Sequence, residues 1–128
     1  MSWFRKSPRG GAPDDIVERL TTTRRFPPRV EQETASLGDE EIVRGWVRAL
    51  RPERDQQVHV RRTWGVVAAV CDGKWPIGVF FTNGERSWVA EPPGGGPSDL
   101  TPEQVEHVVV DALTSTQRPT WPEWRPLV

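Results

Sequence analysis

Two Xaa-Gly dipeptides, Asp72-Gly73 and Asn83-Gly84, constrain this chain more than any other feature, because runs of β-branched and aromatic residues flank each one. Such pairs favour type I′ turns, whose central residues adopt positive φ and whose twist matches that of antiparallel strands. The spacing therefore predicts a three-stranded antiparallel meander over residues 57–71, 74–82 and 85–91.

The strand register follows if both loops contain two residues. Val66 then pairs with Val79, which pairs in turn with Trp88, and the face they share is rich in large apolar residues. We expect this face to pack on the core. The opposite face would carry small and apolar residues, among them Val67, Ala69, Phe80 and Val89. Since a solvated sheet face is normally polar, that composition predicts a cover, supplied either by this chain or by a partner.

Helical periodicity predicts two helices, over residues 36–51 and 101–114, that pack on the core face of the meander. The first has acidic residues in its first turn, and the second begins with a capping box formed by Thr101 and Gln104. A shorter helix is expected over residues 14–24, where apolar residues recur at helical spacing. The predicted fold class is therefore α+β.

We expect one domain over residues 13–128, because a chain of 128 residues with 17 basic and 18 acidic side chains suits a single near-neutral unit. Residues 1–12 are basic and rich in Gly and Pro, so we expect them to be disordered. Residues 92–98 are expected to form a Pro/Gly linker, and residues 118–128 an extended tail rich in Pro and Trp.

The sequence offers little support for catalysis or metal binding, since it holds one Cys and two His. Cys71 ends an apolar strand, where a buried structural role is expected. His59 and His107 are too far apart for the short paired spacings of zinc sites. Acidic residues at 39–41 suit the N-terminus of a helix better than a magnesium site. We therefore expect no enzyme activity, no cofactor and no metal.

Three arginines of the first predicted helix, Arg44, Arg48 and Arg51, lie within about 60° of each other on its outer side. This arginine stripe is interpreted as an ordinary solvated face, as a site for an acidic protein or as a nucleic-acid contact. The net charge of −1 and the isoelectric point of about 6.1 argue against a domain built to neutralise phosphates. Nucleic acid is therefore not the expected partner.

Two tail tryptophans, Trp121 and Trp124, are three residues apart and would project from one side of a polyproline helix. They either fold back over the core of this chain or form a linear motif that docks on another protein. The sequence leaves both interpretations open.

These features favour a small non-catalytic protein-binding module of a bacterial cytoplasm, of the immunity, antitoxin, chaperone or adaptor type. The alternative is a nucleic-acid-associated regulator that uses the arginine stripe. The expected partner is another protein, either an acidic one or a second copy of this chain; no membrane association is expected, because no stretch has the roughly 18 apolar residues of a span. The candidate partner-binding residues are Arg44, Arg48, Arg51, Val67, Ala69, Phe80, Val89, Trp121 and Trp124.

Overall fold

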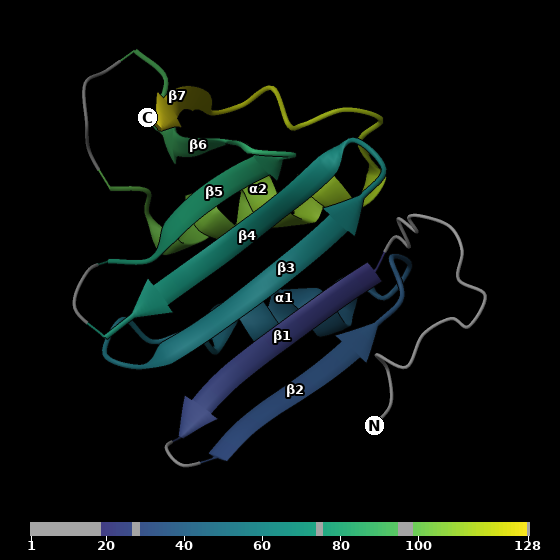
Figure 1. Ribbon diagram of the computed structural model, residues 1–128, viewed down its shortest axis with the longest axis vertical. Coiled ribbons are helices and arrows are strands. Elements are labelled where there is room, and N and C mark those ends of the chain that lie inside the picture. Colours follow the sequence, from purple (N-terminus) through teal and green to yellow (C-terminus); the bar gives the residue numbers. More distant parts are fainter. Residues whose placement is uncertain (1–18, 27–28, 74–75, 95–98, 128) are drawn as a thin grey trace.

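The computed structural model describes residues 19–26, 29–73, 76–94 and 99–127, and it has the α+β class expected from the sequence (Figure 1). The predicted disordered segment 1–12, residues 14–18 of the predicted first helix and residues 95–98 of the predicted linker lie outside the described residues. The elements, in chain order, are β1 (Arg19–Phe26), β2 (Arg29–Ala35), α1 (Glu40–Arg48), β3 (Asp55–Arg62), β4 (Gly65–Asp72), β5 (Gly78–Asn83), β6 (Arg86–Glu91), α2 (Pro102–Thr114) and β7 (Glu123–Leu127).

The strands form one antiparallel sheet in the order β2-β1-β3-β4-β5-β6-β7. Strands β3 to β6 take the place of the predicted three-stranded meander, β7 adds a strand beside β6, and the β1–β2 hairpin adds two further strands beside β3. Both helices lie behind the sheet as it is viewed in Figure 1, so they share one face, as predicted. We call this the helix face, and we call the opposite side the open face.

The core lies between the helix face and the two helices. Val58 and Val60 of β3 are fully buried there, and so are Val67 and Ala69 of β4. The helices contribute another large group of buried apolar side chains, which consists of Val43, Trp46, Val47, Val105, Val108, Val109, Ala112 and Leu113, and Leu50 joins it just after α1. These helical residues recur every three or four positions, as an amphipathic helix requires.

The predicted helix over residues 14–24 is wrong for its described part, because residues 19–24 belong to β1. This strand contains three consecutive threonines, Thr21 to Thr23, whose branched Cβ atoms favour an extended backbone over a helix. It pairs with β2 on one side and with β3 on the other. Those backbone hydrogen bonds outweigh the local helical periodicity of its apolar residues.

The predicted single strand over residues 57–71 is instead the β3–β4 hairpin, with Thr63 and Trp64 at its turn. Gly65 follows with a φ of +142°. A Cβ atom at this position would lie 2.5 Å from a ring carbon of Phe81 and 2.8 Å from the carbonyl oxygen of Thr82. Only glycine fits both this backbone conformation and this space, and the chain reverses its direction here.

The predicted register is wrong between β4 and β5. Gly73 and Gly84 both have positive φ, but Asp72 and Asn83 end strands rather than occupy turns. Val66 pairs with Thr82 instead of Val79. This shift by an odd number of residues moves every β4 side chain to the other face.

Across the β5–β6 hairpin, Phe81 rather than Val79 pairs with Trp88. A shift by two residues leaves the facing of the side chains unchanged, and Val79, Phe81 and Ala90 are buried as predicted. The side chains of β4 therefore lie on the face opposite to the predicted one, whereas those of β5 and β6 lie on the predicted face, because the first register shift is odd and the second is even.

The two predicted helices exist, and α2 matches its predicted range closely. Thr101 and Gln104 form the predicted capping box, with the amide of Gln104 donating to Thr101 Oγ1 at 3.1 Å and the amide of Thr101 donating to Gln104 Oε1 at 2.8 Å. Helix α1 is shorter than the predicted 36–51. Asp39 directs its carboxylate back to the amide and hydroxyl of Ser36, so the helix begins after this turn.

The C-terminal end of α2 is held by the β3–β4 hairpin. The Arg62 guanidinium donates to the carbonyl oxygens of Ala112 and Ser115 at 2.6 and 3.0 Å, and the Trp64 indole donates to Ser115 at 3.2 Å. A cation at this end also opposes the negative end of the helix dipole. These three bonds fix α2 against the sheet.

The corrected register can be tested with a pair of valine substitutions on neighbouring β4 positions. Val67→Thr should lower the free energy of unfolding by about 1 to 3 kcal/mol, because it buries a hydroxyl group beneath the helices. Val66→Thr, on the open face, should change it by less than about 0.5 kcal/mol. Urea unfolding of both variants measures the difference, and the reverse order would restore the register predicted from the sequence.

Candidate functional site

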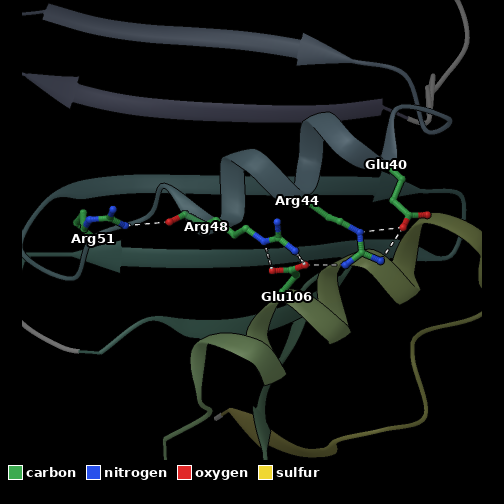
Figure 2. Close-up of polar contacts among 5 residues, drawn as sticks. All are labelled: Glu40, Arg44, Arg48, Arg51 and Glu106. Carbon is green, nitrogen blue, oxygen red and sulfur yellow. Dashed lines mark hydrogen bonds and ion pairs between the residues drawn. The ribbon is translucent and has the colours of Figure 1, made fainter.

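Two residues of the arginine stripe, Arg44 and Arg48, bridge the two helices through Glu106 rather than lie on a free outer surface (Figure 2). Arg44 donates to Glu40 one turn earlier on α1 at 2.6 Å, and also to Glu106 of α2 at 2.6 Å. Arg48 donates to both carboxylate oxygens of Glu106, at 2.8 and 2.9 Å. Glu106 thus joins the two helices through two guanidinium groups.

Glu106 is the most enclosed member of this group, with 13% of its side chain exposed against 66% for Arg48. Hydrogen bonds from Arg48, followed by those from Arg44, lower the pKa of Glu106, and the partial burial of the carboxylate opposes them. The hydrogen bonds with Glu40, followed by the one with Glu106, raise the pKa of Arg44, and the hydrogen bonds with Glu106 raise the pKa of Arg48. Glu106 and both arginines are therefore charged at neutral pH.

Arg51 has a different role from the other two arginines. Its guanidinium donates to the carbonyl oxygens of Arg48 and Leu50, both at 2.9 Å, at the end of α1. Its backbone amide donates to Oε1 of the buried Gln56 on β3. Arg51 therefore satisfies backbone groups that the helix end leaves unpaired.

A cleft of about 730 Å³ runs along the groove between α1 and α2. Its apolar lining includes Val47, Ile77 and Val110. Carboxylates outnumber guanidiniums among its charged side chains, which are Glu40, Glu103, Glu106, Asp111, Arg44 and Arg48. This balance gives the cleft no preference for an acidic ligand, which is the ligand that the arginine stripe alone had suggested.

The predicted apolar patch on the second sheet face is corrected by the register. Val67 and Ala69 are buried under the helices, whereas Phe80 and Val89 belong to the open face. The open face instead carries an apolar group that we call the Phe80 patch. It consists of Val66, Ala68, Val70, Phe80 and Val89.

Phe80 lies at the centre of its patch, between Ala68 on β4 and Val89 on β6. Its ring packs against Gly78, where a Cβ atom would lie only 3.0 Å from a ring carbon. Ala68 is buried, and the other four members of the patch keep part of their side chains exposed. Because Gly78 has no Cβ atom, the ring can approach the β5 backbone at this position.

His59 borders the Phe80 patch, since it pairs with Ala68. Burial, followed by the charge of Arg61, lowers the pKa of this imidazole from its ordinary value of 6.5. One of its ring nitrogens contacts Gln57 Oε1 at 2.7 Å. The histidine therefore adds an uncharged polar edge to the patch at neutral pH.

The tail over residues 118–127 folds back on the rest of the chain, which is the first of the two alternatives that the sequence left open. Strand β7 pairs with β6, and both Trp121 and Trp124 pack against the core. The Trp124 indole donates to the carbonyl oxygen of Pro119 at 2.8 Å, and Trp121 meets His107 edge-to-face. Both tryptophans keep partly exposed surface.

One grouping was missed by sequence reasoning. Arg118 lies over the rings of Phe81, Trp88 and Trp124, with its guanidinium carbon 5.2 to 5.9 Å from the three ring centroids. Arg86 lies over Trp88 at 5.5 Å. These residues are too distant in the chain to form a local motif. The sequence indicated such a grouping only through its many arginine and tryptophan residues.

The described residues contain no group of three His, Cys, Asp or Glu placed to hold a metal ion. Cys71 is buried, with its sulfur 3.5 Å from the carbonyl oxygen of Gln56. Neither helix of the described ranges is long and apolar enough to cross a bilayer.

The fold and these sites define an α+β protein in which two helices occupy one face of an antiparallel sheet and the other face carries an apolar patch. Comparison with known proteins adds no family to this description. No family model matches the chain, and neither a curated protein nor a solved structure matches it significantly.

The link between the helices can be tested with Glu106→Gln. At pH 7 this change should lower the free energy of unfolding by about 1 kcal/mol, a modest loss because Arg48 is mostly solvated. Since the folded pKa of Glu106 is depressed, its contribution is present above the unfolded pKa and is lost as the pH falls through the folded pKa. The difference in free energy of unfolding between the wild type and Glu106→Gln should therefore become smaller at acidic pH.

Urea unfolding at neutral and acidic pH measures both effects, with Glu103→Gln as the control from the exposed part of α2. A pH-independent deficit in Glu106→Gln would show that packing, rather than charge, carries the contribution of Glu106.

Proposed function

We propose that this protein is a small non-catalytic protein-binding module of a bacterial cytoplasm, of the immunity, antitoxin, chaperone or adaptor type. Its partner packs on the Phe80 patch. The observation that carries the proposal is the apolar open face, on which Val66, Val70, Phe80 and Val89 remain partly exposed. Monomeric proteins rarely leave a contiguous apolar patch without a use.

The surroundings of the Phe80 patch support a protein interface. Thr82 and Ser87 lie beside the patch with their hydroxyl oxygens 3.4 Å apart, and Arg61 and His59 border it on β3. An apolar centre with a polar border is the usual anatomy of a protein-binding surface. A central aromatic ring is also a frequent anchor of binding energy.

The alternative of a nucleic-acid-associated regulator receives less support. Arg44 and Arg48 already bond to Glu40 and Glu106, so phosphate contacts would have to compete with ion pairs inside the chain. Arg51 is occupied by carbonyl oxygens at the end of its helix. The protein-binding proposal needs none of these contacts to break.

Phe80→Glu tests the proposal, with Ile42→Glu as the matched control. Ile42 is an apolar residue on α1 with 46% of its surface exposed, so its replacement introduces the same charge away from the open face. Both variants should unfold in urea within about 1 kcal/mol of the wild type. Only Phe80→Glu should lose the proteins that the immobilised wild type captures from host lysate, or lose a dimer seen by light scattering.

Two results would contradict the proposal. Phe80→Glu could keep every captured protein and the mass of the wild type, in which case the patch binds nothing. Alternatively, Phe80→Glu could lose several kcal/mol of stability while Ile42→Glu does not. A loss of that size is the cost of burying an unpaired carboxylate, and it would assign the patch to the core of this chain.

A further inference from the structure

We propose that Arg118 and Arg86, which both lie against Trp88, form a binding site for a carboxylate side chain of the partner protein. The inference rests on the proposed function and specifies the chemistry of that partner. Arg86 directly precedes Ser87, which borders the Phe80 patch, and its side chain points to the helix face. A partner that reaches over the β5–β6 turn would therefore meet both surfaces.

The two arginines share two features: their guanidiniums lie against aromatic rings, and no acidic side chain of the described residues pairs with them. Arg44 and Arg48 are paired with glutamates, and Arg125 is paired with Glu91. The side chains of Arg86 and Arg118 make no hydrogen bond or ion pair with any described residue, and their contacts are with aromatic rings. This end of the sheet therefore carries two positive charges that the described part of the chain does not neutralise.

The ring contacts leave the hydrogen-bonding capacity of the guanidiniums available. A guanidinium has five N–H donors in its plane and no acceptor, and contact with an aromatic ring uses none of those donors. A carboxylate can accept two parallel bonds from one such group. The rings of Phe81, Trp88 and Trp124 around Arg118 reduce its access to water, which strengthens a charged contact there.

The site is preorganised by the segment that carries Arg118. Ser115, before it, accepts hydrogen bonds from Arg62 and Trp64. Pro119, after it, is buried and accepts the bond from the Trp124 indole. Because the backbone is held on both sides, little conformational entropy is lost when a ligand binds to Arg118.

A carboxylate fits the site better than nucleic-acid phosphate. The whole chain has a net charge of −1 and an isoelectric point of about 6.1, so its overall field does not attract a polyanion. Two guanidiniums that lie against the same ring, that of Trp88, suit one or two acidic side chains. The positive charge is confined to the β5–β6 end of the sheet, so a ligand with one or two negative charges suits it better than a polyanion.

Nuclear magnetic resonance of the arginine Nε–Hε groups provides a direct test. The probes are the capped peptide acetyl-Gly-Glu-Glu-Gly-amide and its counterpart with Gln in place of both Glu, at matched ionic strength. The glutamate peptide should shift the Arg86 and Arg118 signals to saturation, and the glutamine peptide should not. The signal of Arg54, an exposed arginine in the loop before β3, should not move.

Arg118→Gln should weaken binding of the glutamate peptide about tenfold or more, which is the usual cost of losing a charged hydrogen-bond partner. Arg118→Lys keeps the charge without the planar fork and should weaken it less. Because Arg118 packs on three rings, the exposed Arg86→Gln provides a second variant that does not disturb this packing and should also weaken binding. Arg54→Gln is the matched control and should bind like the wild type.

Equal responses to the two peptides, or no response of Arg86 and Arg118, would overturn the proposal. Tighter binding of a short oligothymidylate than of the glutamate peptide would overturn it in favour of phosphate. These results are independent of the Phe80→Glu experiment. A failed titration with a successful Phe80 result removes only the carboxylate site, and the reverse pair of results removes only the docking of the partner on the Phe80 patch.

Discussion

The contact of Arg62 and Trp64 with the last turn of α2 determines how the rest of the molecule is arranged. These two side chains satisfy carbonyl oxygens of Ala112 and Ser115, which the helix itself leaves without donors. With that end fixed at the β3–β4 turn, the apolar side of α2 covers the central strands and its outer side presents Glu106 to α1. Four residues beyond the end of the helix, Arg118 lies over the aromatic rings of Phe81, Trp88 and Trp124.

The aromatic rings beneath Arg118 connect the tail to the central strands. Phe81 contacts Trp64, Trp88 and Trp124, with ring centroids 5.1 to 5.9 Å apart. Such tilted pairs stabilise a fold beyond the area that they bury. A short terminal strand such as β7 gains few backbone hydrogen bonds, so the contact of Trp124 with Phe81 of β5 and the ion pair of Arg125 with Glu91 of β6 help to hold it.

The charges of the chain are divided between two kinds of site. Glutamates neutralise arginines where the helices meet each other and where β6 meets β7. At the β5–β6 end, aromatic rings take the place of the glutamates, and the positive charge remains available. Arg44, Arg48 and Arg51, which the sequence made conspicuous, bond to groups of this chain, whereas Arg86 and Arg118, which no local pattern distinguished, lie against aromatic rings with no acidic partner among the described residues.

The sequence by itself determined the α+β class, the capping box and range of α2, the positive φ of Gly73 and Gly84 and the facing of β5 and β6, because these depend on neighbours within a few residues. It did not determine the strand character of residues 19–26, the register of β4 or the partners of its arginines. Strand β4 is apolar at nearly every position, so the alternation of polar and apolar residues could not indicate which of its two faces packs on the core. A register shift by an odd number of residues therefore placed Val67 in the core, where the sequence had predicted Val66. Those choices depend on hydrogen bonds and ion pairs between residues distant in the chain, and only the tertiary structure brings such residues together.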